Sequence, residues 1–332
     1  MYKDSRNIIK SKNSNTAAEH TLYLIKIYID IKYLSSGRIS TNLANTFRGA
    51  FGSTLKRIVC TFPERNCNEC ILSSKCAYGY IFETPIPHNT ELMRKYPYAP
   101  HPLIILPPYQ NSSYISQGKV DTIGITLIGR AIDYIPYIVL TFQELGSSGI
   151  GSSQVKFVVK ELRSEYGDIL FSSEDCILKE IKSFNYFDVR QGNVEKGTFS
   201  LNFFTPLRLQ INGRITELPT FNNIIASLSR RITLLSYFHC GGDGTPLSHY
   251  FKEKTREVEM VNAYTTQVNK KRFSSRQKQK VPMNGFIGTL SFKGDYGSFL
   301  PLLKAGEYTH LGKDTIFGYG FYRLEVEKKD DT

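Results

Sequence analysis

The sequence contains no tryptophan and only six histidines and six cysteines, and its acidic residues are outnumbered by its basic residues. It also lacks any apolar run long enough to span a membrane, and the polar residues 1–20 lack the apolar stretch of a signal peptide. These absences predict a cytoplasmic protein without a membrane partner. In a reducing compartment, cysteines are expected to be thiols or metal ligands before they are disulfides.

The chain does contain enough apolar sequence for a substantial core. Its 332 residues are 41% hydrophobic, which predicts two domains rather than one. The 42 lysines and arginines exceed the 30 aspartates and glutamates and leave a formal charge of +12. A charge of this sign is typical of proteins that neutralise phosphates, although it does not identify a partner by itself.

The two halves of the sequence resemble each other at corresponding places. A Gly-Arg-Ile motif follows a strand-like pattern and precedes a helical pattern at residues 37–39 and again at 213–215. Later in each half, a glycine-rich turn at 149–151 or 318–320 precedes another strand-like segment. Two matches in the same order favour a duplicated fold over coincidence.

Each half has the predicted order strand, helix, further strands, helix, glycine-rich turn and strand. In the first half we expect strands at 22–34, 120–128 and 155–162, and helices from a cap at 40–41 to residue 60 and over 131–145. In the second half we expect strands at 199–211, 286–292 and 321–326, and a helix over 221–235. This is the split βαβ order of a ferredoxin-like unit. The predicted fold class is therefore α+β, with tandem ferredoxin-like (RRM-like) domains and antiparallel sheets.

The predicted domain boundaries follow from this order. Residues 1–20 form a flexible N-terminal segment, and residues 21–163 form an N-terminal domain with a cysteine-rich insertion at 60–80. Residues 164–197 form a connecting hairpin or linker. The C-terminal domain covers residues 198–332 and contains a glycine-rich loop at 310–320.

Several motifs give the chain a family resemblance that covers nearly all of it. The tandem halves, the glycine-rich segment from His310 to Tyr322 and the Phe273-Ser-Ser-Arg-Gln strand resemble the RAMP superfamily. The Phe47-Arg-Gly-Ala-Phe-Gly helix, the cysteine cluster that leads into Tyr80-Ile-Phe-Glu-Thr-Pro, and Arg230-Arg231 resemble the CRISPR precursor-RNA processing endoribonucleases. The resemblance implies cleavage within CRISPR repeat RNA without a metal cofactor, which yields a guide RNA (crRNA) for an effector complex.

The glycine-rich loop is a candidate RNA contact. Gly312, Gly318 and Gly320 are able to adopt positive φ and expose backbone N–H groups to a phosphate, with Lys313 nearby. An ATP-binding loop is excluded, because the spacing differs from G-x-x-x-x-G-K-[ST] and a strand follows instead of a helix. The alternative is a tight helix-to-strand turn that touches no ligand.

The most concentrated positive charge lies between residues 270 and 280, and no acidic residue interrupts it. Such a run attracts a polyanion, the interleaved Phe273 suits stacking on a base, and the serines are able to reach phosphate or ribose. The alternative is a solvated loop or a sheet edge that charge protects from aggregation. The predicted RNA-binding residues of this run are Lys270, Lys271, Arg272, Ser274, Ser275, Arg276, Lys278 and Lys280.

Cys60, Cys67, Cys70 and Cys76 are spaced C-x6-C-x2-C-x5-C, which supplies enough thiolates for a tetrahedral structural zinc site. A site closed by four protein ligands would leave no open position for a substrate. The alternatives are thiols without a ligand, or disulfides.

Cleavage of RNA without a metal needs a base for the ribose 2′-OH, an acid for the leaving 5′ oxygen and a cation for the phosphorane. His239 is the preferred acid, because it lies at a predicted helix C-terminus, where the helix dipole favours its protonated form. Tyr237 is expected to orient the scissile group, and Arg231 and Arg230 to contact phosphate. The alternative is that His239 only caps the helix.

The sequence departs from part of the family, because several relatives carry a histidine on or just after the first helix and residues 41–60 contain none. His310, beside the glycine-rich loop, is the second candidate for proton transfer. Two other functions stay open. One is a non-catalytic RAMP subunit that holds crRNA in an effector complex, and the other is a zinc-bearing RNA-binding module without preference for repeat sequence.

Overall fold

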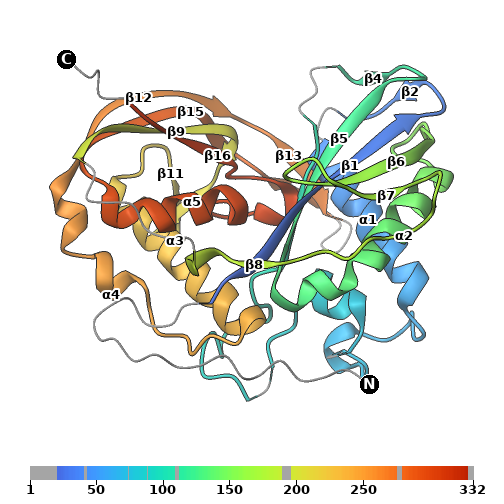
Figure 1. The fold of residues 1–332 in the computed structure, drawn as a ribbon, viewed down its shortest axis with the longest axis horizontal. Coiled ribbons are helices and arrows are strands. Elements are labelled where there is room, and N and C mark those ends of the chain that lie inside the picture. The colour runs from blue at the N-terminus through green and yellow to red at the C-terminus, as the bar shows by residue number, and fades with distance from the viewer. Residues whose placement is uncertain are drawn as a thin grey trace.

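The computed structural model describes residues 21–40, 43–73, 75–87, 89–108, 112–188, 196–274 and 279–327. It consists of two α+β halves that lie side by side, each with an antiparallel sheet and helices packed against it (Figure 1). The segment 1–20, predicted to be flexible, lies outside the described residues. No helix in the described part of the chain is long and apolar enough to cross a lipid bilayer.

The sheet of the N-terminal half has the strand order β3-β5-β1-β6-β7, and all neighbours pair antiparallel. A short strand, β8, pairs with the start of β1, and a small ribbon of β2 and β4 lies outside the sheet. The strands are β1 (Tyr23–Tyr33), β2 (Gly37–Arg38), β3 (Leu103–Leu106), β4 (Tyr114–Ile115), β5 (Val120–Ile128), β6 (Phe157–Ser164), β7 (Ile169–Ser172) and β8 (Phe184–Asn185), and the helices are α1 (Leu43–Val59) and α2 (Ile135–Ser148).

The C-terminal half has the strand order β12-β15-β9-β16, again antiparallel. Two separate hairpins, β10-β11 and β13-β14, project from it. The strands are β9 (Lys196–Leu207), β10 (Leu209–Ile211), β11 (Arg214–Thr216), β12 (Val258–Val268), β13 (Lys271–Ser274), β14 (Gln279–Pro282), β15 (Gly285–Asp295) and β16 (Tyr322–Val326), and the helices are α3 (Phe221–Leu235), α4 (Ser248–Phe251) and α5 (Leu300–Thr309).

The two main sheets have the same topology. When the edge strand β7 is set aside, both place their strands in the chain order second, third, first, fourth, with one helix after the first strand and another after the third. This is the ferredoxin-like arrangement, so the predicted tandem fold is confirmed. The duplication therefore extends from the sequence motifs to the complete sheet of each half.

Some elements differ from the sequence prediction. β12 was not predicted, because most of its residues are exposed and the pattern contains no apolar alternation. The predicted strand 199–211 breaks after Leu207, and β10 leaves the sheet to pair with β11. Residues 164–197 do more than connect the halves, since they contribute β7 and β8 to the N-terminal sheet.

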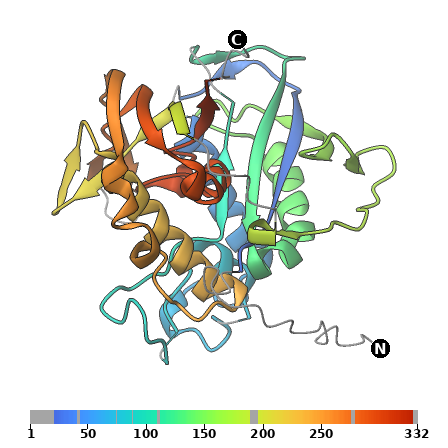
Figure 2. The same ribbon diagram turned by 60° about the vertical axis from the view of Figure 1, so that its left-hand side comes forward.

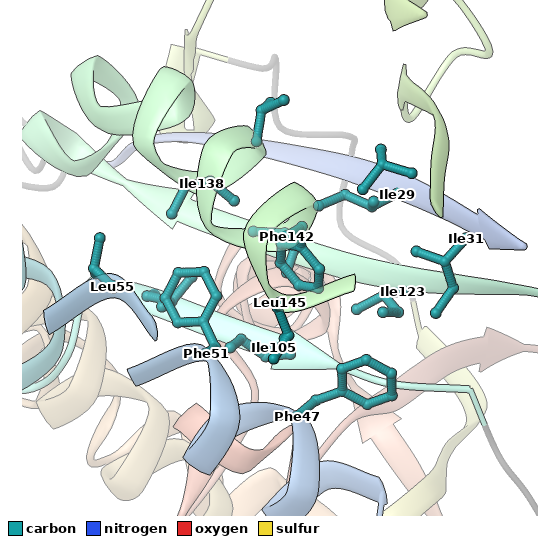
Figure 3. Close-up of a cluster of buried hydrophobic side chains, with 14 of the residues drawn as sticks. Ile29, Ile31, Phe47, Phe51, Leu55, Ile105, Ile123, Ile138, Phe142 and Leu145 are labelled. Atoms are coloured by element: carbon teal, nitrogen blue, oxygen red, sulfur yellow. The ribbon is translucent and has the colours of Figure 1, made fainter. Parts of the chain in front are cut away.

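The core of the N-terminal half explains why these residues fold as they do. Ile29 and Ile31 of β1 point to one face because side chains alternate along a strand, whereas Phe47 and Phe51 recur every four residues along α1 (Figure 3). Phe142 of α2 completes the layer, with its ring centroid 5.6 Å from that of Phe51. The result is a closed sandwich of two helices on one sheet.

The boundary between the halves is also packed. Strands β1 and β5 run side by side along the N-terminal half (Figure 2). Leu22, Leu24 and Ile128, at the ends of these strands, belong to the hydrophobic core of the C-terminal half. A shared core fixes the position of one half against the other.

Two π-helical turns meet at this boundary. One, η2 (Gly79–Glu83), belongs to the long segment between α1 and β3, and the other, η5 (Ser236–Cys240), continues α3. Gly52 on α1 makes room for η2, since a Cβ there would lie 2.0 Å from the ring of Phe82. Gly129 makes room for η5 in the same way, because a Cβ at this position would lie 1.9 Å from the carbonyl oxygen of His239. Because π-turns often mark functional sites, this junction is a candidate site in its own right.

Candidate nucleic-acid interface

The glycine-rich loop between α5 and β16 packs against both halves of the protein. Its short helix η8 (Thr315–Phe317) contacts β3 and α1. Gly318 and Gly320 have positive φ, and a Cβ on Gly320 would lie 1.8 Å from the carbonyl oxygen of Leu311. The loop therefore needs glycine for its close packing, whatever it binds.

The backbone donors of this loop are used inside the protein. The N–H groups of Gly318, Gly320 and Lys313 donate to the carbonyl oxygens of Thr315, Pro206 and Arg208 at 2.8, 3.0 and 2.8 Å. The Lys313 ammonium donates to Gln210 Oε1 at 2.5 Å. These donors do not form the phosphate cradle that the sequence predicted. The geometry fits the alternative of a tight turn, so contact with RNA would have to come from neighbouring side chains.

The basic segment lies next to this loop, as the hairpin β13-β14. The Arg272 guanidinium carbon lies 5.0 Å from the centroid of the Phe317 ring, and its Nε is buried without a hydrogen-bond partner in the described chain. Lys271 and Lys280 are exposed, whereas Lys270 is half-buried. Ser275, Arg276 and Lys278 lie outside the described residues, as do the side chains of Phe273 and Ser274.

Arg48 brings a second guanidinium to the same ring from the other half. Its guanidinium carbon lies 3.9 Å from the ring centroid of Phe82 and 5.0 Å from that of Phe317. Cation–π contacts of this kind fix the position of a guanidinium, and its planar set of N–H groups matches the oxygens of an anion. We name Arg48, Arg272 and Phe317 the arginine seam. From the sequence alone, Arg48 has two interpretations, a phosphate contact or part of the solvated face of its helix.

An open groove of about 360 Å³ runs beside the arginine seam. Phe317 and Phe321 line it together with Phe204, which is 56% exposed, and Lys270 of the basic run lies at its side. The ring centroids of Phe204 and Phe321 are 5.8 Å apart. Exposed aromatic rings beside cations are the usual means by which proteins hold unpaired bases.

His239 lies at the meeting point of the two π-turns, not at the arginine seam. Its Nε2 is 2.7 Å from the carbonyl oxygen of Pro100 and its Nδ1 is 2.9 Å from the Tyr80 hydroxyl. Because a carbonyl only accepts, Nε2 carries the proton and Nδ1 accepts from Tyr80. Burial lowers the pKa of His239 to about 4. A neutral ring with both nitrogens engaged does not fit the general-acid role predicted for it, and its partners show that it joins the halves instead of capping its own helix.

The other residues of the predicted catalytic set also lie at this junction. Arg231 donates from Nε to the carbonyl oxygen of Thr309 at 2.8 Å, and burial lowers its pKa to about 10, so it remains charged at neutral pH. This contact fastens α3 to the end of α5. The Tyr237 hydroxyl accepts from the backbone N–H of Glu91 at 3.2 Å. Arg230 is exposed, with its guanidinium carbon 5.9 Å from the centroid of the Tyr96 ring.

The other two described histidines also have low pKa values, and of these His310 is fully buried, whereas His101 is half-buried. Burial lowers the pKa of His101 to about 3 and holds the pKa of His310 well below its usual range. His310 therefore does not suit proton transfer at neutral pH either. His20, His88 and the side chain of His249 lie outside the described residues.

The four predicted zinc ligands share one region. Cys60, Cys70 and Cys76 line a cavity of about 230 Å³, and burial and the nearby Glu83 raise the pKa of the Cys67 thiol. In the part of the chain that the structure describes, no three histidine, cysteine, aspartate or glutamate side chains are arranged to hold a metal ion. The thiols are neighbours but do not form a tetrahedral set, so a structural zinc site remains a prediction.

Comparisons with known proteins match different parts of the chain to different family models. Residues 201–322 match the family model of the CRISPR-associated endoribonuclease Cas6, and residues 22–183 match a model described as an N-terminal domain. An uncharacterised protein of Archaeoglobus fulgidus is 24% identical over 287 residues, which cover 85% of this chain and 91% of that one.

Solved structures resemble the whole chain. A Thermus thermophilus Cas6 has a TM-score of 0.52 at 12% identity and covers 91% of this chain and 98% of its own. A Cas6 product complex gives 0.51 at 15% identity, covering 92% of this chain and all of the other. A partial Cas6-RT-Cas1–Cas2 complex gives 0.56 at 12% identity over 94% of this chain, which spans only 47% of that longer chain. At these identities, the likenesses show the fold.

The family match and the fold together test the resemblance that the motifs indicated. The match covers the half that contains the glycine-rich loop and the basic hairpin. The fold extends over both halves. The C-terminal half thus matches the family model of the CRISPR-associated endoribonuclease Cas6, and the whole chain has the fold of the solved Cas6 structures, in agreement with the resemblance that the motifs indicated.

Proposed function

We propose that the protein is an endoribonuclease that cleaves CRISPR repeat RNA by attack of a ribose 2′-OH on the adjacent phosphate, without a metal ion. The reaction would release one product with a 2′,3′-cyclic phosphate and another with a 5′-OH. The observation that carries the proposal is the arginine seam, where Arg48 of one half and Arg272 of the other approach Phe317. The crRNA product would then pass to the subunits of an effector complex.

The arginine seam suits the electrostatic part of this reaction. The phosphorane that forms when the 2′ oxygen attacks carries more negative charge than the phosphodiester, and fixed N–H donors stabilise it. A guanidinium presents five such donors in a planar fork that matches phosphate oxygens. Because Arg48 and Arg272 come from different halves, their spacing depends on the interface being correctly packed. We assign the seam to phosphate binding and not to proton transfer, because a guanidinium stays protonated at neutral pH.

The second candidate is a non-catalytic RAMP subunit that binds crRNA. One observation favours it, namely that the surroundings of the described histidines 101, 239 and 310 hold the pKa of each ring below its ordinary value, which does not suit a general acid at neutral pH. Such a subunit would use the same cationic surface and aromatic groove without breaking a bond. The two candidates differ in their products and not in their affinity for RNA.

The test uses the purified chain and the repeat RNA of the neighbouring CRISPR array, labelled at its 5′ end. Cleavage in excess EDTA, with end-group analysis that finds a 2′,3′-cyclic phosphate and a 5′-OH, supports the endoribonuclease. A shifted but intact RNA supports the non-catalytic subunit. Cleavage that stops in EDTA contradicts the metal-free mechanism.

A further inference from the structure

A second cavity lies where the two π-turns meet, and neither the arginine seam nor the groove beside it shares a lining residue with it. It measures about 970 Å³ and is half-open to solvent. One wall is the segment 73–99 of the N-terminal half, and the other is η5 at the end of α3. We name this cavity the interdomain pocket.

The pocket is positively charged. Arg94 and Arg130 line it, and no aspartate or glutamate is among the lining residues. Arg94 donates from Nε to the carbonyl oxygen of Thr90 at 3.0 Å, which fixes the guanidinium through one of its five N–H donors. The Arg130 guanidinium carbon lies 4.1 Å from the centroid of the Tyr80 ring. Two positioned guanidiniums in one cavity favour an anionic ligand.

The pocket is also aromatic. Tyr96, which is 52% exposed, and Phe238 line it, and the ring centroids of Tyr237 and Phe238 are 5.0 Å apart. Arg230 stands beside Tyr96 at the edge, which adds a third cation. A fixed guanidinium beside aromatic rings that are at least partly exposed is suited to a phosphate joined to a planar base.

The walls are held apart at a fixed distance. His239 belongs to the η5 wall and joins the two walls. Its ring hydrogen-bonds the Tyr80 hydroxyl on the opposite wall and the carbonyl oxygen of Pro100, which directly follows that wall in the chain. Tyr237 is tied to the opposite wall through the backbone of Glu91. Thr84 and Gly241, which end the two π-turns, both adopt the left-handed conformation. The pocket is therefore preformed, which lowers the entropic cost of binding.

We propose that the interdomain pocket binds an unpaired nucleotide, with Arg94 and Arg130 on a phosphate and Tyr96 and Phe238 on the base. The C-terminal end of α3, which continues into one wall of the pocket, lies in the lower part of Figure 1, whereas β13 lies in its upper middle. No residue of the arginine seam is among the residues that line the pocket. The nucleotide is either part of the RNA substrate, in which case the inference rests on the proposed function, or a free mononucleotide.

The experiment measures binding of a fluorescein-labelled tetranucleotide RNA to the full chain by anisotropy, with AMP as a competitor. Arg94→Ala combined with Tyr96→Ala should weaken binding about tenfold or more, because both a charge-assisted contact and a stacking partner are lost. Arg57→Ala is the matched control. Its side chain is exposed and paired with Glu144 on the outer surface of the helices, so it removes the same charge without touching the pocket.

Arg94 and Tyr96 line an open cavity and are not part of the core, so the double variant should have the melting temperature of the wild type. Competition by AMP identifies a free mononucleotide as ligand, and binding of the tetranucleotide alone identifies RNA. Equal affinity of the double variant and the wild type for both probes would overturn the proposal, even if repeat RNA is cleaved. If the wild type binds the tetranucleotide more tightly than the double variant but does not cleave repeat RNA, the result contradicts the proposed function and not this inference.

Discussion

The two halves of the molecule share one topology but carry different additions. The N-terminal half inserts residues 60–102 between its first helix and second strand, and this insertion forms η2 and one wall of the interdomain pocket. The C-terminal half inserts the hairpin β13-β14 between its second and third strands and has the longer glycine-rich loop before its last strand. In the N-terminal half, the corresponding turn at 149–151 is short and packs against Gln154. The shared sheets provide a rigid frame, whereas the unequal insertions carry the candidate binding residues.

This difference also separates the two candidate sites. The arginine seam is made by α1, the glycine-rich loop and β13, whereas the interdomain pocket is made by the N-terminal insertion and η5. Neither site is complete in one half. A change that affects one site and leaves the other intact therefore tests the division directly.

The largest effect is expected from the arginine seam. Arg272→Ala should lower the single-turnover cleavage rate of repeat RNA about 10²- to 10³-fold, the usual cost of one transition-state donor. Arg48→Ala should cost a similar factor, and the double variant should cost less than the product of the two because both act on one group. Rates within threefold of the wild type for both single variants would remove the seam from catalysis.

The glycine-rich loop should show the next effect, on stability. In Gly320→Ala, the new Cβ would clash with the Leu311 carbonyl oxygen, and alanine would also be strained at the positive φ of this residue. The free energy of unfolding should therefore decrease by an amount near the upper end of the range of about 1–3 kcal/mol. Gly118→Ala is the matched control, because it has the same backbone strain with nothing within 4 Å of the new Cβ. Equal losses in urea unfolding would show that crowding in the loop is unimportant.

His239 should affect stability in a pH-dependent way. Its pKa falls from the ordinary 6.5 to about 4 on folding, so the unfolded chain binds the proton more readily and stability is lost as pH falls below 6.5. When the pH is lowered from 7 to 5, the free energy of unfolding of the wild type should therefore decrease by about 2 kcal/mol more than that of His239→Ala. The same loss in both proteins would mean that the ring is solvated and charged, which would reopen its role as an acid.

The smallest effect is expected at Arg57, on the same helix as Arg48. Its guanidinium pairs with the Glu144 carboxylate at 3.0 Å on an exposed surface. Arg57→Ala should therefore lower the free energy of unfolding by less than about 1 kcal/mol and leave the cleavage rate unchanged. The comparison of Arg48 with Arg57 is thus a comparison of two faces of α1. A cleavage defect in Arg57→Ala would place RNA on the outer face.

Much of the fold could be predicted because the core strands and helices have regular patterns. β1 alternates buried and exposed residues over its second half, α3 begins at the capping box of Thr220 and Asn223, and the repeated Gly-Arg-Ile motif reveals the duplication. β12 could not be predicted, because an exposed strand has no apolar period. Its position follows from pairing with β15, which is a long-range property of the fold.

The sites were less predictable, for a physical reason. Sequence shows that Arg272 and Arg48 are cations but not that both reach Phe317, because that ring belongs to a loop far from either in the chain. The position of His239 near a helix C-terminus favoured a charged ring. In the structure the ring is buried and hydrogen-bonded to the Pro100 carbonyl oxygen and the Tyr80 hydroxyl, and its burial favours the neutral form. Only the tertiary contacts between the halves decide these protonation states.

The most direct test of the central claim is single-turnover cleavage of a repeat RNA that carries one 2′-deoxynucleotide immediately 5′ of the scissile phosphate, in EDTA. If the ribose 2′-OH is the nucleophile, this RNA should bind with unchanged affinity and remain intact, while the all-ribose RNA is cut at that position. Cleavage of the deoxy-substituted RNA at the same phosphate and rate would contradict the proposed mechanism.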